Sequence, residues 1–259
     1  MNGKRTWIYF ILMIFLMNSF NSTYLLHNPN ENERSTINSE TQRKLFKPTN
    51  EFERNKLITT SFFTKNEGQL RNETIIYYSE NAYFTSMGIS YRFEKKIKND
   101  VGPPPKGIFN NNNNENSMRT CYYEVKFVDS NMVIPIGTEK IGGYSNFLLG
   151  NNSTKWITDV SNFKEIIYPN LYDNIDLKYQ YKPEGLKYEF EVSPGGNISQ
   201  IKMKYVGAEV YTDGNEIFVQ TPFGNIEERD FLTYQIIEEE QVLINAKIIV
   251  KGNILTFDM

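Results

Sequence analysis

Carboxylates are the main candidates for catalytic side chains in this sequence. The single histidine, His27, lies in a polar segment that precedes the strand-rich part. Without a histidine of its own, the strand-rich part cannot assemble a Ser/His/Asp triad, a Cys/His pair or a histidine zinc site. The carboxylates that could supply a glycosidase-type acid–base pair are Asp173, Asp176, Glu184, Glu189, Glu191, Glu227 and Glu228. Glu189 and Glu191 alternate along one strand beside Lys187, however, which is the pattern of a solvated face. We therefore expect no catalytic residue and no enzymatic activity.

The segment Asp173-Asn174-Ile175-Asp176 gathers the hard oxygen ligands that Ca²⁺ prefers. Its spacing does not match the regular Asp/Asn/Gly pattern of a calcium-binding loop. Asp and Asn also shape tight turns ahead of strands, and this structural role is the favoured interpretation. The sequence therefore predicts no metal site and no cofactor.

Aromatic side chains offer a second kind of site, because Trp156 and outward-facing tyrosines could stack on sugar rings. At an aromatic content of 14%, most of these rings are expected in a core instead. Cys121 is the one cysteine, so no intramolecular disulfide can form. It alternates in phase with Tyr123, Val125 and Phe127, which predicts a small buried side chain.

The sequence also carries acceptor motifs for N-linked glycans, of the form Asn-x-Ser/Thr. They occur at Asn72, Asn151, Asn152 and Asn197, with a further match at Asn21. Several such matches are expected by chance in a chain this rich in asparagine. In an exported protein of an organism that glycosylates asparagine, these four positions would be surface acceptors.

The elements that position these residues are predicted to be strands. Apolar and polar residues alternate strictly in the segments 89–94, 175–181 and 186–192. Turn residues separate such segments, as in Lys182-Pro183-Glu184-Gly185 and Asp213-Gly214-Asn215. A dozen or so strand candidates recur at a spacing near ten residues, and no stretch shows a convincing helical period. The pattern favours an all-β fold, either an antiparallel β-sandwich or two small stacked β-sheets.

We expect this β-rich extracellular domain to span residues 61–259, with one long flexible loop at 95–119. The loop segment holds three consecutive prolines and five consecutive asparagines, a low-complexity composition typical of mobile surface segments. Residues 23–60 are rich in Asn, Glu, Ser and Lys without apolar periodicity, which predicts a disordered polar stalk or linker.

The N-terminal segment indicates export. Lys4 and Arg5 precede an unbroken apolar run of 11 residues, Trp7 to Met17, and polar residues follow. We interpret residues 1–22 as an apolar helix that acts as a signal peptide or, if uncleaved, as a membrane anchor. Membrane contact is expected only through residues 7–17. The formal net charge of −3 and the lack of a dense basic cluster argue against nucleic-acid binding.

An ordered set of motifs resembles the N-terminal domain of unknown function of SBBP (β-propeller) repeat proteins, which are exported prokaryotic cell-surface proteins. The motifs are Asn66-Glu67-Gly68-Gln69, residues 146–151 with Lys155-Trp156 and Thr158-Asp159-Val160, Tyr168-Pro169, Ile175-Asp176-Leu177, residues 186–190 with Val192 and Pro194-Gly195, and residues 201–208. The resemblance spans roughly Phe62 to Met259 and implies a β-rich extracellular module without assigned catalytic residues. The family usually continues into propeller repeats, and this sequence ends where they would begin.

Together these observations predict a non-catalytic secreted or cell-surface domain with a structural or interaction role. Its partners would be other surface proteins or glycans, bound through sheet faces or edge strands. A carbohydrate-binding module that uses Trp156 is the alternative, and a carboxylate-dependent hydrolase is a minor one.

Overall fold

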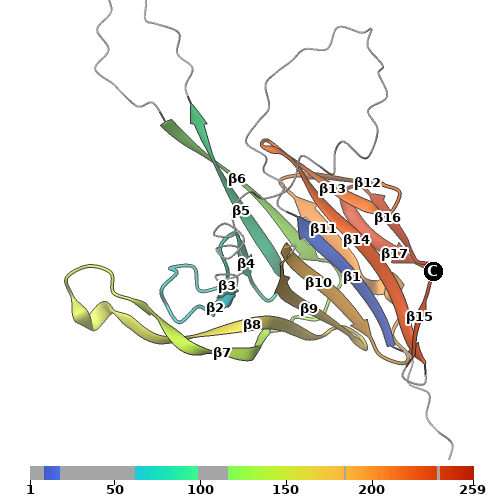
Figure 1. Ribbon diagram of the computed structural model, residues 1–259, viewed down its shortest axis with the longest axis horizontal. Coiled ribbons are helices and arrows are strands. Elements are labelled where there is room, and N and C mark those ends of the chain that lie inside the picture. The colour runs from blue at the N-terminus through green and yellow to red at the C-terminus, as the bar shows by residue number, and fades with distance from the viewer. Residues whose placement is uncertain (1–8, 18–61, 99–115, 184, 238–239) are drawn as a thin grey trace, which may run out of the picture.

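The computed structural model of the chain describes residues 9–17, 62–98, 116–183, 185–237 and 240–259 (Figure 1). Within these ranges every regular element is a strand, apart from two short 3₁₀ turns, η1 (Ser153–Lys155) and η2 (Ile198–Gln200). The strand pairings are antiparallel. The all-β class predicted from the alternating pattern is therefore confirmed.

The strands are short at the start of the body and long in its middle. They are β1 (Tyr9–Met17), β2 (Phe63–Lys65), β3 (Tyr77–Tyr78), β4 (Ala82–Phe84), β5 (Gly88–Lys98), β6 (Asn116–Phe127), β7 (Ile136–Phe147), β8 (Ile157–Tyr172), β9 (Ile175–Lys182), β10 (Gly185–Val192), β11 (Lys202–Val206), β12 (Glu209–Asp213), β13 (Glu216–Thr221), β14 (Gly224–Ile237), β15 (Glu240–Leu243), β16 (Lys247–Lys251) and β17 (Ile254–Asp258). The predicted turns at 182–185 and 213–215 connect the hairpins β9–β10 and β12–β13.

The strands follow one continuous hydrogen-bonded path that folds into two layers. One layer runs from β16 through β17, β11, β6 and β5 to β4. The other runs from β8 through β9, β10, β1 and β14 to β13 and β12. The short strands β2 and β3 link them, because β2 pairs with β8 and β3 pairs with β4. The result is sandwich-like, and the described strands form one sheet instead of two separate ones.

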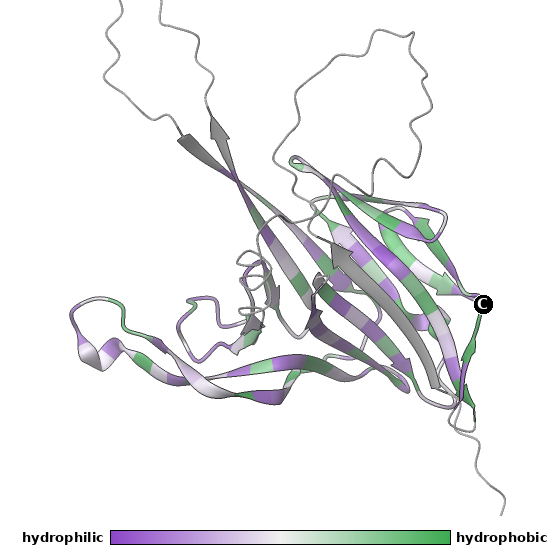
Figure 2. Cartoon of the chain, viewed as in Figure 1, coloured by the Kyte–Doolittle hydropathy of each residue, from purple (hydrophilic) through white to green (hydrophobic). Residues whose placement is uncertain are grey.

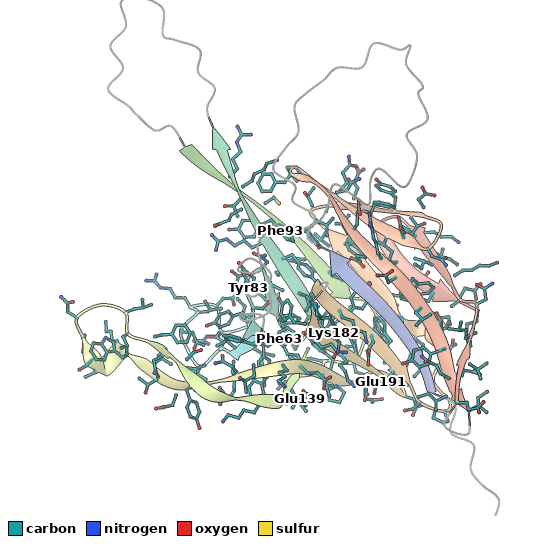
Figure 3. The ribbon with its side chains drawn as sticks, in the orientation of Figure 1. Phe63, Tyr83, Phe93, Glu139, Lys182 and Glu191 are labelled. Carbon is teal, nitrogen blue, oxygen red and sulfur yellow. The ribbon has the colours of Figure 1, made fainter. Side chains whose placement is uncertain are left out.

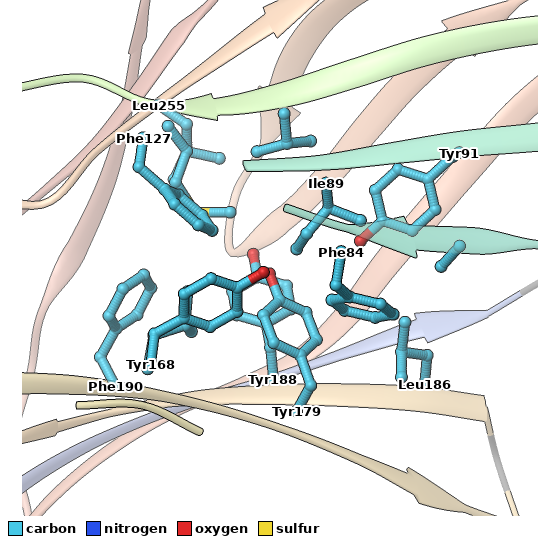
Figure 4. Close-up of a cluster of buried hydrophobic side chains, with 14 of the residues drawn as sticks. Phe84, Ile89, Tyr91, Phe127, Tyr168, Tyr179, Leu186, Tyr188, Phe190 and Leu255 are labelled. Atoms are coloured by element: carbon cyan, nitrogen blue, oxygen red, sulfur yellow. The ribbon is translucent and has the colours of Figure 1, made fainter. Parts of the chain in front are cut away.

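Aromatic rings fill the space between the layers (Figure 4). Phe84 meets Tyr179 edge-on with ring centroids 5.3 Å apart, and Phe127 meets Tyr168 in the same way at 5.3 Å. The predicted inward series is confirmed, since the alternate residues from Ile89 to Phe93, Cys121 to Phe127, Ile175 to Tyr179 and Leu186 to Val192 are buried. Burial of large aromatic side chains is the dominant favourable contribution to folding here.

The expectation of an apolar N-terminal helix is wrong for the described part of that segment, because residues 9–17 form the strand β1. β1 lies between β10 and β14 and pairs with both. The segment is rich in aromatic and β-branched residues, which suit an extended strand when two strand edges are available. No helix in the described ranges has the length and apolar character needed to span a membrane. The predicted stalk at 23–60 lies outside the described residues.

One strand continues through a proline, and one predicted loop boundary differs from the structure. β8 continues through Pro169 to Tyr172, since the register of its pairing with β9 shifts between Tyr168 and Tyr172 and the proline lies within that irregularity. The predicted loop at 95–119 is too long at both ends, because residues 95–98 pair with residues 116–119 in the β5–β6 ladder. Residues 99–115 lie outside the described ranges.

Candidate functional site

Glu228 of β14 lies within the aromatic core and is 2% exposed. Its Oε2 accepts a hydrogen bond of 2.8 Å from the Tyr188 hydroxyl, and its Oε1 accepts one of 3.0 Å from the Tyr205 hydroxyl. Burial raises the pKa of Glu228 to about 7, and the two tyrosine hydrogen bonds act in the opposite direction. Glu228 is therefore a titratable group at neutral pH that is sealed within the aromatic core.

Glu228 reaches the core because β14 alternates in phase from Ile226, which is also buried. Its donors come from β10 and β11, so three strands meet at this carboxylate. Burial, followed by the charge of Glu228, raises the pKa of both Tyr188 and Tyr205 well above the usual tyrosine range. These hydroxyls are therefore hydrogen-bond donors at physiological pH, and the cluster is a structural polar network of the core.

A second charged cluster lies on the opposite face of β8, β9 and β10. Lys178 Nζ is 2.7 Å from a Glu191 carboxylate oxygen and 3.8 Å from oxygens of Glu165 and Glu189. Lys187 forms an ion pair with Glu189. Burial lowers the pKa of Lys178, but its carboxylate partners outweigh that effect and the net pKa is raised. The cluster thus joins two lysines to three carboxylates.

The expectation that Glu189 occupies a solvated face is wrong, because Glu189 is 7% exposed and Lys187 is 6% exposed. Glu191, labelled in Figure 3, remains half-buried on β10. The reason is that β10 lies in the middle of its layer, between β9 and β1. Tyr234 of β14 also lies near this cluster. Burial, followed by the charges of Glu189 and Glu191, raises the pKa of Tyr234.

The remaining predicted carboxylates do not converge with these clusters. Glu227 forms an ion pair with Arg229 on the face of β14 opposite Glu228. Asp176 accepts a 2.6 Å hydrogen bond from the Asn170 backbone N–H. Asp173 lies in the same tight turn, where Asn174 has a positive φ of 61°, so the predicted turn role of this segment is supported. Glu184 lies outside the described residues, as does His27.

Metal-ligand chemistry is also limited in the ranges that the structure describes. No group of three His, Cys, Asp or Glu side chains there is close enough together to hold a metal ion. Cys121 is 8% exposed, and burial raises the pKa of its thiol. Its interpretation as a small buried side chain is confirmed.

A groove of about 440 Å³ lies on the outer face of β4, β5 and β6. Tyr83, Arg92, Tyr122 and Glu124 contribute to its lining, together with the loop around Asn72. Tyr83 is labelled in Figure 3. A hydrogen bond with Tyr83, followed by the charge of Glu94, raises the pKa of Arg92. Sequence reasoning missed this groove because its walls come from three separate segments and share no motif.

Trp156 lies at the far end of the arm that β7 and β8 form (Figures 1 and 2). The side chain is 40% exposed, and its indole Nε1 donates a 3.0 Å hydrogen bond to the Gly150 carbonyl. Leu148 and Leu149 beside it are 55% and 73% exposed. The arm therefore presents a small apolar tip in which the tryptophan is held by the loop.

The four acceptor asparagines are all exposed. In Asn72, Asn152 and Asn197 the side-chain Oδ1 accepts hydrogen bonds from both the N–H and the hydroxyl of the residue two positions later. Asn152 and Asn197 also cap the 3₁₀ turns η1 and η2. The Asn-x-Ser/Thr pattern thus has a structural role at three positions. A glycan would be attached to Nδ2, so the two roles are compatible.

A family model described as a domain of unknown function, DUF7948, matches residues 63–259. The match covers most of the chain, and the chain therefore belongs to this family. No curated protein and no solved structure matches the chain. The sequence resemblance is confirmed at the level of a domain of unknown function, while the link to SBBP-repeat proteins rests on the motifs alone.

Proposed function

We propose that this member of the DUF7948 family is a non-catalytic structural or interaction domain that acts outside the cytoplasm, secreted or at the cell surface. Export is supported by the basic pair Lys4 and Arg5 ahead of the apolar run Trp7 to Met17. The motif resemblance to the N-terminal module of SBBP-repeat surface proteins supports the same location. The family itself carries no assigned function.

The observation that carries the interaction role is the arm formed by β7 and β8. Its tip projects away from the core (Figure 1), and Leu148, Leu149 and Trp156 at this tip are exposed. Large apolar side chains gathered on a projecting hairpin cost solvation free energy, and they are typical of contact surfaces. The arm is therefore the part of the described chain that we assign to partner contact.

A non-catalytic role is supported by the way charged side chains are used. Glu228 is held by two tyrosines within the core, and Lys178 lies among three carboxylates. Each of these groups has a partner inside the fold, so its chemistry serves packing and not a substrate.

Location is tested by expressing the full chain with a C-terminal epitope tag and treating intact cells with protease. We expect the tag to be released from cells or to be digested at their surface. Protection of the tag until the cells are lysed would contradict export.

Contact through the arm is tested with a photo-crosslinking amino acid placed at Leu149 in the exported chain. We expect crosslinks to a surface protein or to surface glycan from this position, and few from a matched position at exposed Lys251 on β16, which lies outside the groove of β4, β5 and β6. Equal crosslinking from both positions would argue against a dedicated arm contact.

Carbohydrate binding is the second candidate, favoured by the groove on β4, β5 and β6. It combines the rings of Tyr83 and Tyr122 with the charged groups of Arg92 and Glu124, a combination suited to a sugar ring and its hydroxyls. A glycan array probed with the wild-type chain, Tyr122→Ala and Trp156→Ala separates the two candidate surfaces. Loss of binding in Tyr122→Ala assigns the groove, and loss in Trp156→Ala assigns the arm. An array without any bound glycan excludes this candidate.

A further inference from the structure

β1 lies in the middle of its layer, between β10 and β14. It pairs antiparallel with β10 from Phe10 opposite Val192 to Leu16 opposite Leu186. On its other side it pairs with β14 from Tyr9 opposite Ile236 to Met17 opposite Glu227. β10 and β14 do not pair with each other in the described structure. β1 is therefore the strand that closes the layer between them.

The core lies directly beneath this strand. The register places Ile14 opposite Tyr188 of β10 and Leu16 opposite Glu228 of β14. The 2.8 Å hydrogen bond from Tyr188 to Glu228 therefore connects the two neighbours of β1 across its position. Since adjacent strands are about 4.8 Å apart, removal of β1 would leave a gap of about 10 Å between β10 and β14. Water would then reach a core in which Phe190 is 0% exposed and Tyr188 is 1% exposed.

The same residues cannot both fill this position and serve export. This step rests on the proposed export of the chain, in which residues 7–17 are cleaved off or held in a membrane. Either fate withdraws β1 from the sheet and leaves two long unpaired edges. Unpaired edges with apolar surroundings recruit another strand, which supplies the missing main-chain hydrogen bonds.

We propose that the position between β10 and β14 is a strand-acceptor site, which in the exported protein takes up an apolar strand from a separate polypeptide. β1 itself shows the chemistry that fits, namely nine consecutive apolar residues in a strand that pairs antiparallel with both edges. Elsewhere, the segments 18–61 and 99–115 contain no apolar run of that length, and a second copy loses the same residues on export. We therefore assign the site to a strand of a different polypeptide that carries such an apolar run.

A central strand gives a strict sequence requirement for the occupant. The pairing with β14 shifts register between Met13 and Phe15. At the other inner positions each backbone N–H group is directed to one neighbour or the other, so a proline there removes a hydrogen bond and clashes with the ladder. This requirement separates strand insertion from adsorption of an apolar peptide, because adsorption tolerates proline.

The test uses the full chain with a specific protease site inserted near residue 40. The chain is cut after folding, unfolded in denaturant and refolded with an equimolar fluorescent peptide of residues 7–18 flanked by lysines. We expect the peptide to replace β1 in about half of the molecules, as measured by anisotropy and by intact mass after gel filtration. A peptide carrying Leu12→Pro should bind at least about tenfold more weakly, because Leu12 is in register with Phe190 of β10 and with Thr233 of β14. The uncut chain, whose own strand stays attached, is the matched control and should bind little peptide.

Absence of peptide from the refolded cut chain, or equal binding of the proline peptide, would overturn the strand-acceptor site. The exported chain is assayed separately. Its intact mass reports whether residues 9–17 were removed, and binding of the same peptide reports whether the site is vacant or can be refilled. A chain that remains inside cells would overturn export and the separate occupant together, whereas an exported, trimmed and folded chain that binds no peptide would overturn the acceptor site alone.

Discussion

At the scale of single residues, Glu228 links the packing of the core to pH. A carboxylate whose pKa is raised on folding binds its proton more tightly in the native than in the unfolded state. Its contribution to stability is therefore fully present below the ordinary pKa near 4.5 and is lost as pH rises through about 7. The change in pKa corresponds to roughly 3 kcal/mol across that window. The contribution of Glu228 should therefore make the free energy of unfolding larger at pH 5 than at pH 8.

The substitution Glu228→Gln removes this titration while keeping an oxygen that can accept from Tyr188 or Tyr205. We expect the variant to gain about 1–2 kcal/mol over wild type at pH 8 and to show a flatter pH dependence between pH 5 and 8. Urea denaturation at several pH values measures both effects. Glu227→Gln, on the other face of β14, is the control for substitution on this strand. If the free energy of unfolding of Glu228→Gln depends on pH as steeply as that of wild type, Glu228 is not the titrating group.

Lys178 illustrates how burial changes the contribution of an ion pair to the free energy of unfolding. Its side chain is 19% exposed among three carboxylates, so Lys178→Met should leave those charges poorly compensated and cost about 2–4 kcal/mol. Lys126→Met is the matched control, because the Lys126–Glu124 pair has side chains 54% and 46% exposed and should contribute below about 1 kcal/mol. Chemical denaturation of both variants gives the comparison, and similar losses would refute it.

At the scale of elements, Gly88 permits the close approach of β5 to β6. A Cβ at this position would lie 2.2 Å from the Val125 carbonyl oxygen and 3.0 Å from the Lys126 Cα, both backbone atoms that cannot rotate away. Gly88→Ala should therefore destabilise the protein by at least about 2 kcal/mol. Gly142→Ala in β7 meets nothing within 4 Å and should stay within about 0.5 kcal/mol of wild type. Thermal unfolding compares them, and an intact melting temperature in Gly88→Ala would show that the strands can separate.

Local chemistry explains which elements were predictable from the sequence. The hairpin β9–β10 was predicted because Pro183 and Gly185 set its turn, and its inward residues alternate within the same short window. The outer part of the β7–β8 hairpin was not, because its side chains are mostly exposed and leave no alternation to detect. The burial of Glu189 was missed for a different reason: its neighbours Lys178 and Tyr234 lie on β9 and β14, outside the local alternation.

At the scale of the whole molecule, the two ends of the strand path meet at Asn253. Its Nδ2 donates to the Ala208 carbonyl at 3.2 Å, its Oδ1 accepts from the Val210 N–H at 3.3 Å, and its φ is positive at 61°. The side chain thus joins the β16–β17 turn to the start of β12. The sequence could suggest a turn at Lys251-Gly252-Asn253, but a contact across more than forty residues has no local signal.

Asn253→Ala removes both hydrogen bonds and also leaves an alanine at a positive φ, where its backbone is strained. Asn253→Gly removes the same hydrogen bonds, but glycine adopts a positive φ without strain. We expect losses of about 2–3 kcal/mol for alanine and about 1–2 kcal/mol for glycine. Urea denaturation measures the difference. Wild-type stability in both variants would mean that the ends of the path do not depend on this residue.

The location of the indole groups determines what optical spectroscopy can follow in this protein. The two tryptophans are Trp7, outside the described residues, and Trp156 at the arm tip, while the tyrosines Tyr91 and Tyr123 stack in the interior with centroids 4.8 Å apart. In a Trp7→Phe background, emission would report loosening of the arm, and near-ultraviolet circular dichroism would report the tyrosine stack. A melting curve recorded by fluorescence alone would then report only the arm of β7 and β8, whereas the dichroism signal would report unfolding of the core.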